Sequence, residues 1–206
     1  RHLFSWRGVD ITYGVEAFFD RFISNSRSIE PGVGVFTDAD KRRIEAKQAY
    51  AQAHFKPWPT LNLVVGAYVR DLETEILTKA QIDPRFGIAW RPLDKHWVRV
   101  AFQQKLVFPD RAAETIAPVD TVGLVVPDQF FAGFEGGQRV DDYRARWESE
   151  WTPRLFTYAE ASRQDISDYD DADGNVALAR VDQLRVGANL WLGEATGLNV
   201  RGELRS

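Results

Sequence analysis

The sequence contains no cysteine, which excludes a disulfide scaffold, a thiol nucleophile and thiolate metal ligands. No apolar run approaches the ~18 residues of a transmembrane helix. The three histidines, His2, His54 and His96, are far apart in the sequence and match no metal-ligand spacing. Acidic residues (30) and basic residues (26) nearly balance and are interspersed, so the sequence carries no sign of nucleic acid binding.

Helical periodicity is also scarce. The best candidate, residues 38–55, is rich in alanine and charged residues, which favour a helix by intrinsic propensity. From Glu45 onward, however, alanines and Phe55 alternate with glutamines, Tyr50 and His54. Alternation with a period of two is typical of a strand whose two faces meet different surroundings, so we interpret this segment as a strand.

The sequence does contain alternating apolar and polar residues along most of its length. The alternation is clear in residues 9–18, 61–70, 84–91, 97–105, 143–151, 184–192 and 198–204. The stretch from Leu155 is too mixed for its faces to be assigned. We predict an all-β fold of about nine antiparallel strands, each about 8 to 12 residues long. Such a strand is long enough to cross a bilayer at a tilt.

The predicted connections alternate between short and long. The short ones are 57–60, 92–96, 152–154 and 193–197, and the long ones are 24–43, 71–83, 107–141 and 166–179. A soluble sandwich has no physical reason for this alternation, because its connections mix lengths at both ends. A membrane barrel keeps its turns short on one side and its loops long on the other. We expect the longest connection, 107–141, to fold into the barrel or to cap it.

The tryptophans support the barrel interpretation. All of them except Trp147 lie near the short-turn end of a predicted strand, where a membrane interface selects amphipathic rings. Trp97 and Trp191 fall on the polar face of their strands, which weakens the pattern. The alternative is that tryptophan packs over turns at strand ends in a soluble sheet.

We predict that the two faces of the strands contact different environments. In a membrane barrel the charged face lines a water-filled lumen and the apolar face contacts lipid, whereas in a soluble sandwich the apolar face is the core. The residues that we predict to line the lumen are Arg85, Arg99, Arg144, Arg146, Glu148, Glu150, Arg201 and Glu203. The residues that we predict to face lipid are Phe86, Ile88, Trp90, Val98, Val100, Val186 and Leu190.

The stretch "IDPRFGIAWRPLDKHWVRVAFQQKL", residues 82–106, resembles the hairpins of Gram-negative outer-membrane barrels. In those hairpins an Asn-Pro or Asp-Pro pair opens a strand that ends at "WRP" and returns through a polar turn. TonB-dependent receptors carry similar hairpins. The stretch from 114 to 166, with its "PDQFF" loop and its "LFTYAEASRQD" strand, is more similar to the C-terminal barrels of proteins that bear periplasmic tetratricopeptide repeats.

This resemblance covers about residues 82–166 and implies a location in the Gram-negative outer membrane. It implies a passive conduit or a surface-assembly role rather than catalysis, as in exporters of exopolysaccharide. The partners that it implies are the lipid bilayer and an upstream periplasmic helical-repeat region or an envelope assembly. No tetratricopeptide repeat is visible in the sequence itself.

Residues 1–206 are accordingly expected to form one segment of a larger barrel, truncated at both ends, since the strand count is odd and no initiating methionine is present. The leading functional hypothesis is an outer-membrane channel or export conduit for exopolysaccharide or another envelope polymer. The second is a TonB-dependent-type receptor or surface-binding barrel, in which the long loops recognise the ligand. The third is a soluble β-rich binding domain.

Little in the sequence indicates catalysis or a cofactor. Nothing orders a Ser-His-Asp set, so we predict that the chain is not an enzyme. The acidic stretch 165–175 does not fit an EF-hand, because Arg180 would take the position of the bidentate glutamate. Two alternatives remain for this stretch, namely a solvated turn-rich loop or a looser Ca²⁺ site. The ligands of such a site would be Asp168, Asp170, Asp171 and Asp173.

Overall fold

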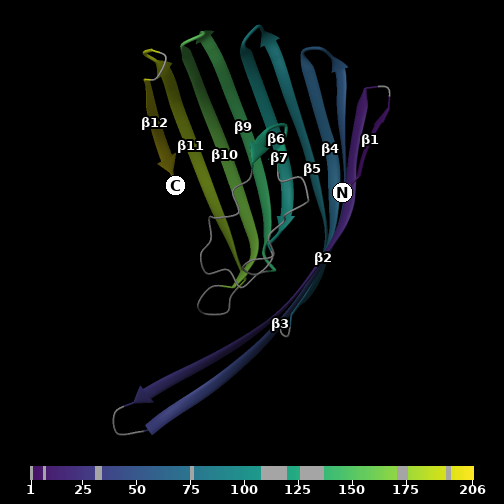
Figure 1. Cartoon of the computed structure of the whole chain (residues 1–206), viewed down its shortest axis with the longest axis vertical. Coiled ribbons are helices and arrows are strands. Elements are labelled where there is room, and N and C mark those ends of the chain that lie inside the picture. The colour runs from purple at the N-terminus through teal and green to yellow at the C-terminus, as the bar shows by residue number, and fades with distance from the viewer. Residues whose placement is uncertain are drawn as a thin grey trace.

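The computed structural model of the chain describes residues 2–6, 8–30, 34–74, 77–107, 120–125, 137–170, 176–193 and 196–206. Within these ranges, ten strands form one antiparallel sheet in the order β1-β2-β3-β4-β5-β6-β9-β10-β11-β12, and β7 and β8 form a separate two-stranded hairpin (Figure 1). The described residues include no helix long and apolar enough to span a membrane. The prediction of an all-β antiparallel fold is confirmed.

The strands have the following bounds. The first half contains β1 (His2–Trp6), β2 (Val9–Glu30), β3 (Gly34–Trp58), β4 (Leu61–Thr74), β5 (Thr78–Leu93) and β6 (His96–Leu106). The second half contains β7 (Asp120–Thr121), β8 (Leu124–Val125), β9 (Arg139–Thr152), β10 (Leu155–Asp170), β11 (Val176–Trp191) and β12 (Gly197–Arg205).

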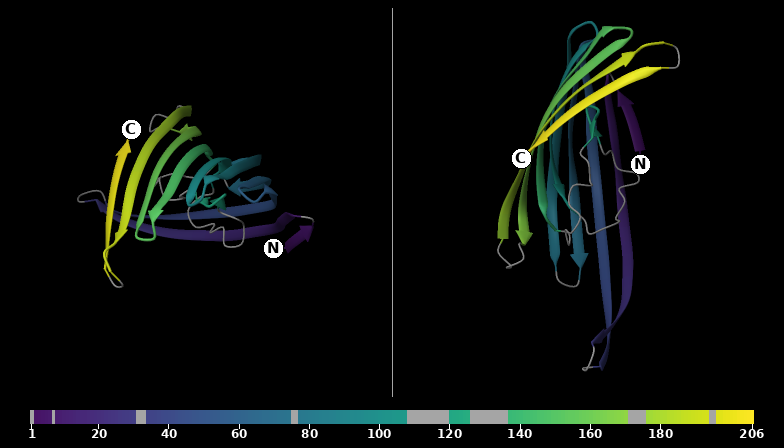
Figure 2. Two further views of the ribbon diagram at one scale, coloured as in Figure 1. Left: turned by 90° about the horizontal axis from the view of Figure 1, so that it is seen from above. Right: turned by 90° about the vertical axis from the view of Figure 1, so that its left-hand side faces the viewer.

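The sheet is strongly curved and open, with β1 and β12 as its two edges (Figure 2). We call its inner surface the concave wall and its outer surface the convex face. In β5, Asp83, Arg85 and Ala89 lie on the concave wall and are buried, while Phe86 and Ile88 lie on the convex face and are exposed. This is the reverse of a soluble sheet, in which the apolar side is the buried one.

Residues paired on neighbouring strands lie on the same face, so the register makes each face continuous across the sheet. On the convex face, Ile88 pairs with Val100, which pairs with Ala145, which pairs with Ala161, which pairs with Leu184. Since side chains alternate along a strand, a shift of one residue would turn every apolar side chain inward. The register is therefore what separates the polar wall from the apolar face.

The described residues form ten paired strands, close to the expected number of about nine, because His2–Trp6 also pairs with β2. The predicted connections need correction. The connections predicted at 24–43 and 71–83 are largely strand, since β2 and β3 stay paired out to Glu30 and Gly34 and since β4 and β5 are separated only by residues 75–77. The connection predicted at 166–179 is shortened in the same way by β10 and β11. The sequence of these outer parts lacks regular apolar and polar alternation, although the strand pairing continues through them.

Candidate functional site: the polar concave wall

A chain of ion pairs crosses the concave wall from β6 to β12. It begins at Arg99 of β6, whose Nε lies 2.9 Å from a carboxylate oxygen of Glu148 on β9. Arg146 contacts the same carboxylate, with 2.9 Å between its Nε and the other oxygen. Two arginines thus share one glutamate, and neither is left uncompensated at this partly buried position.

Glu160 of β10 is the central acid of the chain and is only 5% exposed. Its carboxylate lies 3.6 Å from Arg144, 3.6 Å from Arg146 and 3.5 Å from Arg185. Three guanidinium groups from β9 and β11 therefore converge on one carboxylate. The cross-strand register makes this possible, because Glu160 lies directly opposite Arg146 on one side and Arg185 on the other.

The chain of ion pairs ends on β12. Arg185 lies 3.3 Å from Glu203, and Arg201 lies 2.7 Å from the same carboxylate oxygen. We call the connected set the arginine ladder, consisting of Arg99, Glu148, Arg146, Glu160, Arg144, Arg185, Glu203 and Arg201. Its five arginines and three glutamates give the wall dense fixed charge of both signs, with a formal excess of two positive charges.

Asp142 extends the arginine ladder toward the outer ends of the strands. Its carboxylate accepts two hydrogen bonds from Arg144, each 3.1 Å long, and a third of 2.7 Å from the Gln164 side chain. A paired Arg–carboxylate geometry of this kind is among the stronger side-chain contacts in proteins. Asp142 is 2% exposed, so it depends on these donors for stability.

A second polar cluster lies where β6 separates from β5. The pairing of these strands stops at Arg85 and Gln103, and beyond that point side chains take the place of the missing neighbour. Asp83 accepts a 3.0 Å hydrogen bond from the Leu106 amide, and Arg70 donates a 2.9 Å hydrogen bond to the Leu106 carbonyl. Arg70 and Asp83 are themselves 3.2 Å apart and fully buried.

Aromatic rings complete the wall on the β3–β5 side. Tyr50 and Tyr68 stack with 5.2 Å between ring centroids, and the guanidinium of Arg85 lies 3.8 Å from the Tyr68 centroid. On the opposite side Arg146 lies over Tyr158 at 4.7 Å. Arginine over an aromatic face gains a cation–π contact, which stabilises a charge that is shielded from water.

The charged residues predicted for the lumen lie on the concave wall, with one difference in their contacts. Two of these residues are buried, namely Arg85, which lies over the Tyr68 ring, and Arg144. The members that take part in the arginine ladder are Arg99, Arg144, Arg146, Glu148, Arg201 and Glu203. Glu150 lies instead near the short turn, where it pairs with Lys95 at 2.6 Å. That these residues line a lumen remains a prediction.

The residues predicted to face lipid all lie on the convex face. Phe86, Ile88, Trp90, Val100 and Val186 are exposed, whereas Val98 and Leu190 are half-buried between their neighbours. A contact with lipid remains a prediction for them. The sheet nevertheless presents an apolar surface that has no cover within the chain as described.

Charged residues bound this apolar band at the long-loop end. On the convex face, Arg163 pairs with Asp182 at 2.7 Å and Arg180 pairs with Asp165 at 2.8 Å. The hydrogen bond from Arg163 holds the pKa of Asp182 below its ordinary value. At the other end of the band, exposed tryptophans lie next to the short turns, namely Trp6, Trp58, Trp90 and Trp151.

The height of this band can be compared with that of a membrane. On β9 the band runs from Tyr143 to Trp151. At about 3.4 Å per residue these positions are ~27 Å apart along the strand, and a barrel tilt of about 40° reduces the height to ~20 Å. Outer-membrane barrels carry an apolar band of about 25 Å between aromatic girdles, so the two heights are comparable.

Several residues of the wall were missed from the sequence. Asp83, Asp142, Glu160 and Arg185 were assigned no role, although three of them join the arginine ladder or extend it. Glu160 lies in the stretch from Leu155 whose faces could not be assigned. Its partners become visible only when the register places it opposite Arg146 and Arg185.

The predicted calcium ligands cannot be placed in the same way. Asp171 and Asp173 lie outside the described residues, and the side chains of Asp168 and Asp170 at the end of β10 do so too. Among the residues that the structure does describe, no group of three or more His, Asp or Glu side chains is arranged to hold a metal ion. The calcium site remains a prediction.

No family model matches the sequence, and no curated protein matches it. Solved structures do match its fold. The alcaligin outer membrane receptor FauA from Bordetella pertussis has a TM-score of 0.55 at 14% identity, over 97% of this chain and 40% of that chain. The ferric-catecholate import receptor Fiu from E. coli K12 has a TM-score of 0.60 at 13% identity, over 98% of this chain and 36% of that one.

A third match is FpvAI in its complex with pyocin S2, with a TM-score of 0.61 at 13% identity, over 99% of this chain and 32% of that one. At such identities the likeness is one of fold. The chain spans about a third to two fifths of the length of these structures, and its open sheet matches part of a TonB-dependent receptor barrel. The matched proteins are named as receptors, not as enzymes.

Proposed function

We propose that the chain forms part of the wall of an outer-membrane transport barrel of the receptor type, located in the Gram-negative outer membrane. The convex face contacts lipid, and the concave wall lines an aqueous interior. The observation that carries this proposal is the polarity of the sheet, in which Arg70, Asp83 and Arg144 are buried on one face while Val65 and Val186 are exposed on the other.

The solved structures favour the receptor alternative over the passive export conduit. The sheet matches barrels named as an outer membrane receptor and an import receptor, and nothing in these comparisons supports an exopolysaccharide exporter or a helical-repeat partner. The mixed charges of the arginine ladder suit a hydrated polar solute, because they offer both hydrogen-bond donors and acceptors along the wall. We therefore propose transport of a polar solute as the function.

Cell fractionation of the full-length protein tests this proposal. We expect the protein in the outer-membrane fraction, and we expect the purified protein to need detergent to stay monodisperse. Liposomes that contain it should swell slowly in arabinose, because a receptor barrel is not an open diffusion pore. A monodisperse protein in plain buffer would contradict the membrane location, and rapid swelling would contradict the receptor type and favour the conduit.

A further inference from the structure

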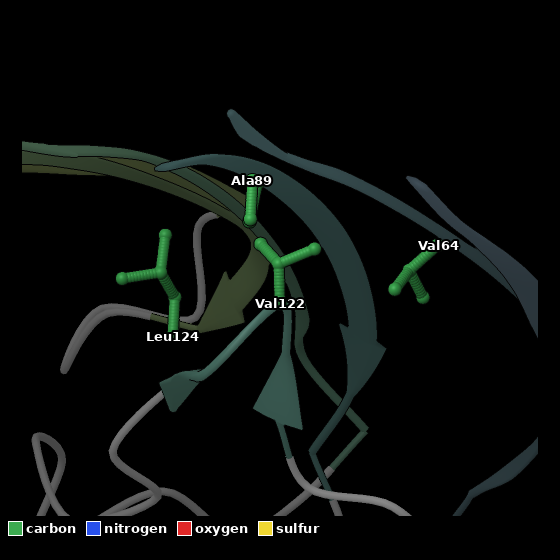
Figure 3. Close-up of a cluster of buried hydrophobic side chains, with 5 residues drawn as sticks. Val64, Ala89, Val122 and Leu124 are labelled. Carbon is green, nitrogen blue, oxygen red and sulfur yellow. The ribbon is translucent and has the colours of Figure 1, made fainter. Parts of the chain in front are cut away.

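The small β7–β8 hairpin, residues 120–125, lies against the concave wall beside β5 and β6 (Figures 1 and 3). Val122 and Leu124 of the hairpin pack against Val64, Ala89 and Ala101 of the wall. These wall residues form an apolar patch that is separate from a second buried apolar cluster of Ile44, Ala46, Leu72 and Leu106. We call this patch the seat.

Gly87 has no side chain and so lets the hairpin approach the wall closely. A Cβ atom at this position would lie 2.7 Å from the Thr121 Cγ2 and 2.9 Å from the Val122 Cγ2. Real Cβ atoms do not approach other carbons so closely, so any larger residue at position 87 pushes the hairpin away from the wall. Thr121 is fully buried in this contact and lies 3.4 Å from the Gln103 side-chain oxygen.

Arg99 ties the hairpin to the arginine ladder. Its Nη1 donates a 2.7 Å hydrogen bond to the Val122 carbonyl, while its Nε contacts Glu148 at 2.9 Å. The planar guanidinium can serve two acceptors in fixed directions at once, which a lysine ammonium at the same position cannot do as well. The tether therefore depends on the shape of arginine as well as on its charge.

The hairpin turn is held in an unfavourable backbone conformation. Val122 has a φ of 52° and Gly123 a φ of 79°. The left-handed region is rare for a β-branched residue and costs free energy unless the surroundings hold it in place. Here the bonded carbonyl and the packed side chain of Val122 do so, which is the pattern expected where a turn has a specific position to keep.

We propose that the β7–β8 hairpin is a constriction element of the barrel, docked in the seat and tethered by Arg99, which limits the size of the solute that can pass along this part of the wall. This inference rests on the proposed transport function. Displacing the hairpin widens the path, and fixing it in the seat keeps the path narrow.

The first experiment measures docking without reference to transport. The protein has no cysteine, so single thiols can be introduced cleanly. Ala89 is 1% exposed beneath the hairpin, and A89C in the full-length protein should react at least tenfold more slowly with a charged methanethiosulfonate reagent than S162C, a control on the same wall outside the seat. Adding R99Q to A89C should remove most of this protection. Equal reactivity of A89C and S162C would overturn the docking.

The second experiment separates the tether from the lumen charge. R99K keeps the positive charge but loses the paired geometry, and R146K makes the same change elsewhere on the arginine ladder. We expect R99K to unmask A89C to nearly the extent that R99Q does, and R146K to leave it protected. If only R99Q unmasks A89C, charge rather than the tether holds the hairpin.

The third experiment tests constriction itself. G87V places a branched side chain where a Cβ atom alone would already lie 2.7 Å from Thr121 Cγ2, so it displaces the hairpin from its seat. We expect liposomes with G87V to swell several-fold faster in arabinose than liposomes with wild type. G202A is the glycine control, because its Cβ would meet only the Val186 Cγ2 at an ordinary 3.5 Å.

The outcomes distinguish the two proposals. Protection of A89C together with unchanged swelling of G87V would overturn the constriction role and leave the transport barrel standing. Failure of wild-type protein to enter the outer membrane would overturn the transport barrel itself. Correct insertion of G87V, checked by heat-modifiable migration, ensures that its swelling reports on the hairpin rather than on misfolding.

Discussion

The two faces of this sheet differ in the polarity of their side chains. On the concave wall, charged residues such as Arg144 and Glu160 are buried and paired with one another. On the convex face, apolar side chains such as Val186 are exposed, and among the described residues the charged pairs lie beyond the apolar band. The comparison teaches that the wall is organised by electrostatic pairing, while the convex face is apolar and has no cover among the described residues.

The largest effect is expected from breaking the buried pair on the concave wall. D83A leaves Arg70 buried without its carboxylate and removes the acceptor of the Leu106 amide. We expect a loss of about 3–5 kcal/mol in the free energy of unfolding, measured by urea titration in lipid vesicles. The double variant R70M/D83L should recover much of that loss, because well-packed apolar residues can replace a buried ion pair. A double variant no better than D83A would show that the hydrogen bonds to Leu106 dominate.

A charge introduced on the convex face should lower the free energy of unfolding slightly less than D83A does. V186R is expected to destabilise the inserted protein by about 2–4 kcal/mol, because arginine is then exposed to lipid near the middle of the band. N189R on the same strand points to the concave wall and is the matched control, since Asn189 pairs with Asn199 there. The measurement is the same urea titration. Similar losses for the two variants would argue against a lipid boundary on the convex face.

Removing the central acid of the arginine ladder should have an intermediate effect. E160Q leaves three guanidinium groups with a weaker acceptor, and we expect a loss of about 2 kcal/mol. E203Q is the comparison, because its side chain is 36% exposed and water screens its pairs with Arg185 and Arg201. A surface pair of this kind contributes under about 1 kcal/mol. If E203Q lowers the free energy of unfolding as much as E160Q does, burial does not determine how much each ion pair of the arginine ladder stabilises the protein.

The smallest effect is expected from the charged pairs beyond the apolar band. Arg163 lowers the pKa of Asp182 in the folded protein, so the stabilisation is fully present above the unfolded pKa of about 3.9 and is lost as the pH falls through the folded value. Wild type should therefore lose slightly more stability than D182N between pH 6 and about pH 2.5. Parallel pH profiles for the two proteins would show that the pair contributes nothing.

The inner parts of the strands were predictable because their two faces differ. Arg85 and Phe86 were assigned to opposite faces from alternation alone, and the structure places them there. The same physics explains what was missed. Where the sequence shows no apolar and polar alternation, as in residues 24–43 of β2 and β3, a paired strand cannot be distinguished from a loop.

The contacts of the concave wall were harder to predict than its composition. Glu160 finds its three arginines through the register of β9, β10 and β11, which no single strand encodes. The docked hairpin was expected only in general terms, as a long connection folding inward. Strands of two residues have no periodicity, and the backbone of Val122 is one that its residue type rarely adopts.

The most direct test of the opposite faces uses two adjacent residues. Arg185 joins the arginine ladder on the concave wall, and Val186 lies on the convex face. Nitroxide spin labels can be attached to R185C and V186C in the full-length protein in liposomes, and their relaxation measured with oxygen, which partitions into lipid, and with a water-soluble nickel chelate. The account predicts that oxygen relaxes the label at 186 more strongly and that the nickel chelate relaxes the label at 185 more strongly. Equal accessibility of both labels to the nickel chelate would contradict it.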